Sequence, residues 1–515
     1  MSDLFHRFTR FSSRGAAPRP TQSFGRRGVT GVVLVATLLA GCAVGPNYQR
    51  ATVAIPAHFK EAADGWKPAA PADRDDRGAW WLAYQDPTLT ALIEQANQSN
   101  QTVASYEAAY RQAQALTAQA RSGYFPTVSA SSSATRSGSG GGSNSTDSVS
   151  SRGVQNSYSL SGQASWEPDL WGKVQRDVAS EKASQQAAAA DLANARLSAQ
   201  ATLAQDYFQL RALDSAQTLL DNTVAAYQRS LALTQNRYQQ GVAGRADVVQ
   251  AQTQLQSAQA AAVDNGIARA QYEHAIAVLI GQPASTFSLA HAEVSTFLPE
   301  VPAQLPSTLL ERRPDVAAAE RRAAAANEQI GVAMSAFFPT LSLSASGGFD
   351  SATFAQWLTA PARVWSLGPQ LALTLFDGGL RHAQVEAARA AFDEQSADYR
   401  QTVLQAFQDV EDNLVSLRVL ANEIVIQQQA VVSAQQALNI VSNEYKAGTT
   451  TYLDVLSAQA TAFSAQRSLI DIEGRRLVAN AGLVKALGGG WDSEQLVQAN
   501  ASAAPTAQAR VGQGS

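Results

Sequence analysis

Two stretches of the chain keep a helical composition over an unusual length. Residues 173–240 and 380–447 contain neither Pro nor Gly and are rich in Ala, Gln, Leu and Arg. At 1.5 Å per residue, each stretch predicts a helix about 100 Å long. Helices of that length need neighbours along their surface, because propensity alone does not hold them together in water. We therefore expect a long helical bundle in which the alanines permit close packing.

Shorter segments alternate between apolar or small residues and polar ones. Tyr158–Trp166 keeps this alternation over nine residues, Leu341–Ala345 repeats it, and Leu371, Leu373 and Leu375 share one face of a later segment. A period of two predicts β-strands whose two faces meet different surroundings. A membrane strand with lipid on one side and water on the other fits the pattern, and so does a half-buried strand of a soluble sandwich.

The same succession of elements occurs twice along the chain. Identical residues recur at a constant offset of 207 positions, from Tyr238 to Tyr445, Gly241 to Gly448 and Asp247 to Asp454. Each copy begins with a helical stretch (91–122 and 316–336) that ends before a Phe-Pro pair, since proline disfavours helix in the residue before it. Two strands, a long helix, a glycine-bearing turn and a second helix follow. Such a repeat predicts two equivalent structural units, with a Gly- and Ser-rich loop (137–151) inserted in the first.

The N-terminus has the order of an export signal. Six arginines precede an apolar run from Val29 to Ala40, and the chain's single cysteine, Cys42, follows at once. The ending Leu38–Cys42 resembles the bacterial lipobox, in which the thiol carries lipid; the alternative is an ordinary signal peptide with a chance cysteine. We expect a signal peptide (1–41), a lipid-anchored segment (42–90), a first repeat (91–298), a second repeat (299–490) and a disordered tail (491–515).

The residues that carry catalytic or metal chemistry are sparse. Cys42 has no second cysteine to pair with, the four later histidines (His58, His274, His291 and His382) are widely separated, and no phosphate-binding glycine loop is found. Loss of the six leader arginines leaves the mature chain more acidic than the net charge of −4 of the whole, which disfavours nucleic acid as a partner. We therefore expect no enzyme activity, no metal site and no cofactor beyond the lipid on Cys42.

The number of strands limits how the chain can enter a membrane. The two copies together predict about four membrane strands, whereas the smallest membrane barrels need eight because open edges leave backbone groups unpaired in lipid. Two chains would give eight strands and a filled interior, and three would give twelve strands with room for a passage. The expected assembly is an oligomeric tube with a barrel in the membrane and helices projecting from it.

Several local sequences resemble those of the outer membrane factor (TolC-like) family, and in particular its NodT-type lipoproteins. They are Gly41–Tyr48, Trp80-Trp81 with Asp86-Pro87, Tyr124-Phe125-Pro126, Glu311–Asp315, Phe376–Gly379 and both Tyr-x-x-Gly…Asp-Val turns. The resemblance covers essentially the whole mature chain. It implies a mainly α homotrimer with a twelve-stranded outer-membrane β-barrel, continued by a long periplasmic α-helical barrel. It also implies a tripartite efflux system, in which the channel passively conducts substrates that an inner-membrane pump, usually of the resistance-nodulation-division type, delivers through a periplasmic adaptor.

The resemblance also implies roles for the two glycine-bearing turns. They would close the periplasmic end of the tube and dock the adaptor, with Tyr238, Gly241 and Gly448 at the docking tips. Three copies each of Asp247 and Asp454 would then line a narrow entrance, attract cations and raise one another's pKa, while Tyr445 bonds across the closed hairpins.

A purely structural role for these residues is open as well. Asp247 with Gln250 matches a capping box, Asp454 is a second candidate cap, and Gly241 and Gly448 suit left-handed helix C-caps. The sequence also departs from the family's best-known gate, because Thr450 and Ser457 stand where an arginine and a second aspartate occur. The chemistry of the latch therefore stays open.

Charged residues elsewhere have simpler interpretations. Asp409, Glu411 and Asp412 could line the tunnel, although a solvated helix face is favoured, and Pro314 predicts a helix start without a transport role. A structural or adhesive envelope-spanning lipoprotein that does not conduct is the alternative function. A periplasmic adaptor would show one hairpin among compact β-rich domains, whereas two hairpins each follow a strand pair here. An enzyme is the least favoured interpretation.

Overall fold

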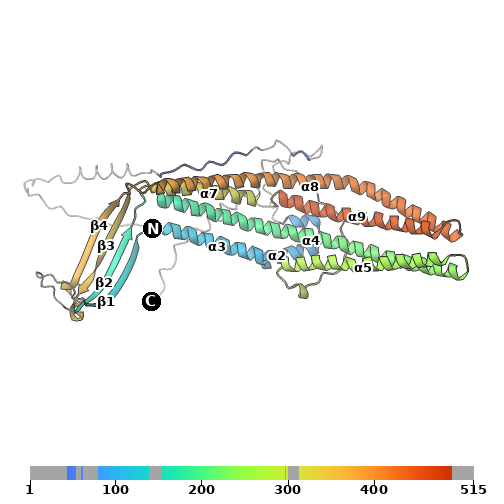
Figure 1. The fold of residues 1–515 in the computed structure, drawn as a ribbon, viewed down its shortest axis with the longest axis horizontal. Helices are drawn as coiled ribbons and strands as arrows, with labels where there is room; N and C mark the ends of the chain where they lie inside the picture. The colour runs from blue at the N-terminus through green and yellow to red at the C-terminus, as the bar shows by residue number, and fades with distance from the viewer. Residues whose placement is uncertain are drawn as a thin grey trace, which may run out of the picture.

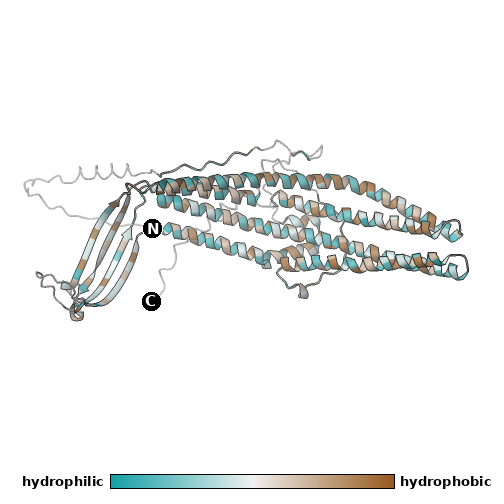
Figure 2. Cartoon of the chain, in the orientation of Figure 1, coloured by the Kyte–Doolittle hydropathy of each residue, from teal (hydrophilic) through white to brown (hydrophobic). Residues whose placement is uncertain are grey.

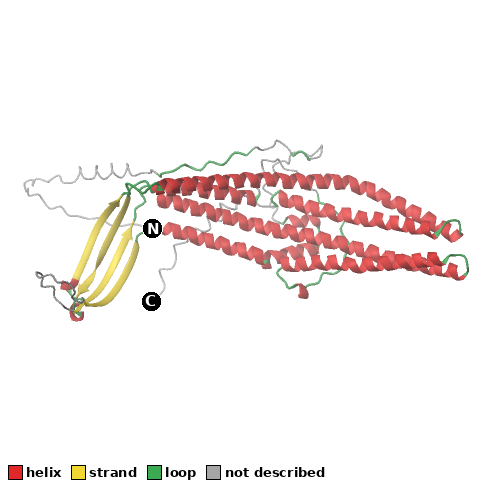
Figure 3. Ribbon diagram, in the orientation of Figure 1, coloured by secondary structure: helices red, strands yellow, loops and turns green. Residues whose placement is uncertain are grey.

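The computed structural model describes residues 43–53, 59–61, 79–138, 154–295, 297–299 and 313–489. The predicted signal peptide, Cys42, most of the 137–151 insert and the predicted tail lie outside these residues. The described chain is strongly elongated, with a small β-sheet at one end and helices running away from it along the long axis (Figures 1 and 3).

Two long helices and two shorter ones make the body of the molecule. They are α4 (Lys173–Gln239), α5 (Arg245–Leu279), α8 (Leu380–Ala447) and α9 (Tyr452–Ala486). The predicted long helices are confirmed, and α4 ends one residue earlier than expected. Helix α4 packs against α5 on one side and α9 on the other, and α9 packs against α8. The two helical hairpins therefore lie side by side, and their turns meet at the end far from the sheet (Figure 1).

The leading helices differ from the sequence expectation in the first copy. One helix was expected over residues 91–122, but the structure has α2 (Pro87–Ser99) and α3 (Gln101–Ser122), whereas the second copy has a single helix, α7 (Pro314–Ser335). The break falls at Asn100, whose backbone is extended and whose side chain accepts the Val103 N–H at 3.0 Å and donates to the Leu279 carbonyl at 2.7 Å. These bonds satisfy the exposed helix ends, which explains the break.

The four strands form one antiparallel sheet in chain order. They are β1 (Thr127–Gly138), β2 (Val154–Trp166), β3 (Thr340–Ser351) and β4 (Arg363–Ala372). Pairing of β2 with β3 joins the two copies of the repeat. The predicted strands at 158–166 and 341–345 are confirmed, whereas Leu373 and Leu375 follow the end of β4 instead of lying in it.

The strand register separates an apolar face from a hydroxyl-rich one. Residues directly opposite one another share a face, which places Val128, Leu160, Trp166, Leu343, Phe349 and Leu367 on one side. Serines dominate the other side, where Ser131 bonds to Ser161, Ser133 to Ser159 and Ser346 to Ser366 at 2.8–2.9 Å. Figure 2 shows the alternating hydropathy along the strands. A sheet with two such faces suits lipid on one side and water on the other.

None of the helices within the described residues is long and apolar enough to cross a membrane.

One side of the helical layer is covered by additional segments. The short 3-10 helix η1 (Trp80–Tyr84) and α2 pack on α4 through an apolar cluster that includes Trp80, Leu89 and Phe208. Tyr84 donates from its hydroxyl to Asn480 of α9 at 2.5 Å. Residues 59–61 lie on α8, where the Lys60 and Glu61 backbone N–H groups donate to the Glu411 carboxylate. We call this covered side the outer face.

Candidate functional site

The turns of the two hairpins end their helices in the same way. Gly241 and Gly448 have φ values of +75° and +84°, and the following residue donates its N–H back to the carbonyl of Arg237 or Glu444. Glycine adopts this left-handed conformation without steric strain, so it ends each long helix sharply. The predicted left-handed caps are confirmed at both positions.

The two aspartates of the turns are helix caps in this chain. The expectation that Asp247 starts α5 and pairs with Gln250 is wrong by three residues: Gly244 is the N-cap, and its N–H donates to the Asp247 carboxylate at 3.2 Å. Helix α5 therefore begins at Arg245, ahead of Asp247, and no Pro or Gly between these two residues interrupts it. Asp454 lies three residues inside α9 and accepts from the Thr451 N–H.

Asp454 is held more firmly than Asp247. Its carboxylate also accepts the hydroxyls of Thr450 at 2.8 Å and Thr451 at 2.5 Å. These hydrogen bonds favour the ionised form and keep the pKa of Asp454 below its ordinary value. Thr450, which replaces a bridging arginine in the family pattern, thus supports the carboxylate of its own turn.

Arg237 links the two hairpins near their turns, and sequence reasoning missed it. Its Nη1 donates to the carbonyls of Tyr445 at 2.7 Å and Lys446 at 3.3 Å, and the guanidinium lies 4.6 Å from the centre of the Tyr445 ring. The last carbonyls of a helix lack helical partners and carry partial negative charge, so a cation there is stabilising. The sequence signal that could have revealed this link is the position of Arg237 in the last turn of α4.

Tyr445 contributes its ring and its backbone to this link. The side chain is buried with Tyr452, Val455 and Ala251, and the two tyrosine rings lie 5.6 Å apart. Among the described residues the Tyr445 hydroxyl has no hydrogen-bond partner. Tyr238, the matching tyrosine of the first copy, is 46 % exposed. Of the two equivalent tyrosines of the repeat, Tyr445 is therefore buried and Tyr238 is exposed to solvent.

Acidic residues on α8 do more than face solvent. Asp409 accepts from the Arg313 guanidinium at 3.1 Å, and Glu411 binds the 59–61 segment. Asp412 is exposed. The expected solvated face is thus wrong for Asp409 and Glu411, because Asp409 binds the residue before α7 and Glu411 binds the 59–61 segment. The predicted helix start is confirmed, since α7 begins at Pro314.

The N-terminal segment is anchored where the helices meet the sheet. The Val44 N–H donates to the Trp171 carbonyl at 3.1 Å, and a Cβ at Gly172 would lie 2.9 Å from the Cα of Ala43. The Trp171 indole in turn donates to the Pro339 carbonyl at 2.7 Å. Ala43 is therefore fixed beside the boundary between the sheet and the helical body.

Within the described ranges, no group of three or more His, Cys, Asp or Glu side chains could hold a metal ion.

The chain is similar to known proteins over almost its full length. The family model of outer membrane efflux proteins matches residues 92–282 and 305–489. The pyoverdine export outer membrane protein OpmQ of Pseudomonas aeruginosa is 32 % identical, with 89 % of this chain and 96 % of that protein covered. The toluene efflux pump outer membrane protein TtgC of Pseudomonas putida is 30 % identical, with 92 % and 97 % covered.

A solved structure gives the same result. The outer-membrane channel OprN matches with a TM-score of 0.80 at 30 % identity, over 87 % of this chain and all of that one. The predicted fold class is thereby confirmed: this is the mainly helical, two-repeat fold of trimeric outer-membrane channels, with membrane strands and a long periplasmic extension. The chain belongs to the outer membrane efflux protein family and is an outer-membrane efflux channel.

Proposed function

We propose that three copies of this chain form the exit duct of a tripartite efflux system. An inner-membrane pump supplies the energy, and a periplasmic adaptor joins the pump to the hairpin turns. The sheet supports the trimer because β1 and β4 are both edge strands in a single chain. Edges cannot stay open in lipid, and pairing β1 of one copy with β4 of the next closes a barrel of twelve strands.

The observation that carries the proposal is the position of the two turns. Both lie at the end of the molecule opposite the sheet (Figure 1), so the membrane barrel and the turns are separated by the length of α4 and α8. Helices of 67 and 68 residues reach about 100 Å. The turns, with Tyr238, Gly241 and Gly448, are thus the part of the channel that an adaptor from the inner membrane meets first.

The entrance of the duct is closed in this proposal by the same turns. Asp247 and Asp454 supply negative charge around the threefold axis, and Arg237 with Tyr445 holds the two hairpins of each chain together. The capping bonds of Asp454 are compatible with this role, because they favour the ionised form of its carboxylate. The reaction class is passive conduction, without an enzymatic step.

Lipidation of Cys42 belongs to the same proposal. Ala43, the next residue, packs against Gly172 at the boundary between sheet and helices. A diacylated Cys42 would therefore insert its chains into the membrane beside the barrel. This position supports a lipid anchor over a chance cysteine in an ordinary signal peptide.

Single-channel recording in planar bilayers tests the proposal. The lipidated wild-type protein should give discrete, cation-preferring conductance steps, and the Asp247→Asn/Asp454→Asn double variant should lose much of that preference. The matched control is Asp264→Asn, an aspartate of α5 away from the turn. Unchanged selectivity in the double variant removes the aspartates from the gate, and absence of conductance from correctly assembled protein refutes the channel.

A further inference from the structure

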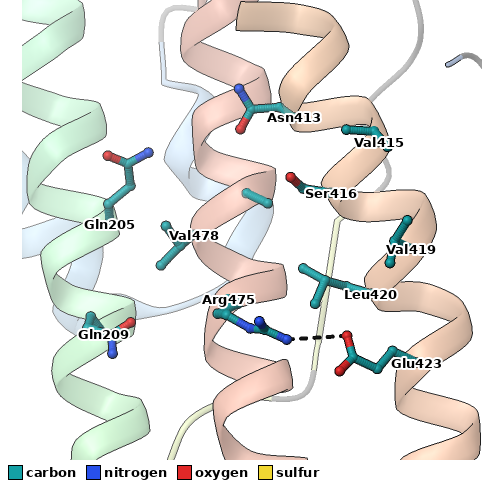
Figure 4. Close-up of a pocket in the computed structure, with 11 residues that line it drawn as sticks. Gln205, Gln209, Asn413, Val415, Ser416, Val419, Leu420, Glu423, Arg475 and Val478 are labelled. Carbon is teal, nitrogen blue, oxygen red and sulfur yellow. Dashed lines mark hydrogen bonds and ion pairs between the residues drawn. The ribbon is translucent and has the colours of Figure 1, made fainter.

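A groove of about 550 Å³ lies among α4, α8 and α9, near the middle of α4. Its polar lining includes Gln205, Gln209 and Ser416, and its apolar lining includes Val419, Leu420 and Val478. Figure 4 shows these side chains converging from three helices, with the ion pair of Arg475 and Glu423 at one end.

The groove opens on the side of the helical layer away from the outer face. Gln205 and Tyr207 are two residues apart and therefore point about 200° apart around α4, and Tyr207 packs in the outer cluster. On α9, Asn480 contacts Tyr84 of the outer face, while Arg475, five residues earlier, lies about 140° away. Residues 59–61, η1 and α2 cover the outer face, so we place the groove side toward the interior of an assembled tube.

The charged end of the groove carries an excess of carboxylate. Arg475 lies 3.3 Å from the Glu423 carboxylate and 3.2 Å from that of Asp471. One guanidinium thus faces two carboxylates, and all three side chains are about half exposed. An organic anion would have to displace a carboxylate from Arg475, whereas a cation finds uncompensated negative charge beside an apolar wall.

We propose that this groove is a transit site for amphipathic organic cations passing through the channel. The apolar wall of Val419, Leu420 and Val478 takes the hydrophobic part of the cargo, Glu423 takes its positive charge, and Gln205 and Gln209 offer hydrogen bonds. Binding is weak, because a conducting site must release what it binds. This inference rests on the proposed function, because transported solutes reach the groove only if the chain assembles into a conducting tube.

Isothermal titration of the full-length detergent-solubilised protein with ethidium, an aromatic monocation, tests the site. Empty micelles provide the baseline for partitioning into detergent. Glu423→Gln should weaken binding about three- to fivefold, the range expected for one exposed charge pair. Arg475→Met should strengthen binding by a similar factor, since it frees both carboxylates. Damage to the fold lowers affinity in both variants, so the opposite signs separate the charge effect from misfolding.

A matched control lies on the same helix. Glu386→Gln removes another exposed carboxylate of α8, paired with Arg389 at 2.7 Å and outside the groove, and should leave the affinity unchanged. Equal affinity of wild type and Glu423→Gln, or a fall in affinity for Arg475→Met, overturns the inference. Potassium conductance of the same preparations keeps the two proposals apart: a conducting channel with unaltered ethidium binding refutes the groove alone, and absence of conductance refutes the duct.

Discussion

In the first copy of the repeat, Trp80 and Leu89 dock the leading segment on α4 through an apolar cluster. In the second copy, α7 packs on α8 through a smaller apolar cluster that includes Val316 and Tyr399, and Arg313, the residue before α7, adds an ion pair with Asp409 of α8 at 3.1 Å. Helices α2 and α7 each begin with a proline, although α7 matches α3 in length and in its distance from the Phe-Pro pair. The leading segments of the two copies are thus held by contacts of different chemistry.

The two hairpin turns also differ in the residues that form contacts between them. Arg237 of the first copy corresponds to Glu444 of the second at the offset of 207. The backbone carbonyls of both residues accept within their own turns, but only the Arg237 side chain reaches the other hairpin among the described residues, where it donates to the carbonyls of Tyr445 and Lys446 at the end of α8. One copy has become the donor of the link and the other its acceptor, which a pair of identical turns could not provide.

The largest expected effect is at the polar docking of the second copy. Arg313→Ala removes a buried guanidinium that binds two carboxylates and the Ala486 carbonyl. The free energy of unfolding should fall by about 3 kcal/mol, because the Ala486 carbonyl is left buried without a partner and the partly exposed carboxylates of Asp315 and Asp409 lose their cation. Thermal unfolding followed by circular dichroism measures the loss.

Arg322→Ala is the control for this prediction. Arg322 lies on α7, its only ion-pair partner within the described residues is Asp191, and its side chain is 46 % exposed. Surface pairs of this kind contribute less than about 1 kcal/mol. Equal losses in the two variants would contradict the difference between polar docking and ordinary surface pairing.

The second effect concerns the link between the turns. Arg237→Ala removes two hydrogen bonds to helix carbonyls and a cation–π contact, which together stabilise the closed arrangement by about 2–3 kcal/mol. Single-channel conductance should rise because the hairpins separate more readily. Arg229→Ala, at an exposed arginine of the same helix, should leave conductance unchanged.

Tyr445→Phe sharpens the assignment of the link. The Tyr445 hydroxyl has no partner among the described residues, so its removal should leave conductance near the wild-type level. A strong increase in Tyr445→Phe, matching Arg237→Ala, would show that the hydroxyl bonds across the hairpins and that the backbone and ring are secondary.

Much of the fold was predictable because its signals are local. The long helices follow from 68 residues without Pro or Gly, the turns from Gly241 and Gly448, and the strands from alternation. The break at Asn100 and the Arg237 link were missed, since both depend on carbonyls of helices distant in sequence (Leu279 and Tyr445). The displaced cap at Asp247 shows that helix starts are the weakest part of sequence reasoning.

A third and smaller effect concerns one position at which the two copies differ in charge. Burial raises the pKa of Asp206 to about 6, and Asn413 occupies the corresponding position of the second copy. A carboxyl with a raised pKa destabilises the folded state once it ionises, so stability should fall as the pH rises from about 4 to about 6. Asp206→Asn should stabilise the protein by about 1 kcal/mol at pH 7, after allowance for solvent screening. A thermal midpoint at pH 7 equal to or below the wild-type value would contradict this.

The smallest effect separates the two aspartates of the turns. The folded-state pKa of Asp454 lies below its ordinary value of about 3.9, so its capping contribution is complete above pH 4 and is lost as the pH falls through the lowered pKa. Conductance should therefore be insensitive to this group between pH 7 and pH 5 and should increase only in more acidic solution. Asp454→Asn should remove that acid response, whereas Asp247→Asn, which removes the charge of the other turn and leaves an amide oxygen to accept the Gly244 N–H, should retain it. An acid response that persists in Asp454→Asn would place the titrating group elsewhere and would make the two turns equivalent after all.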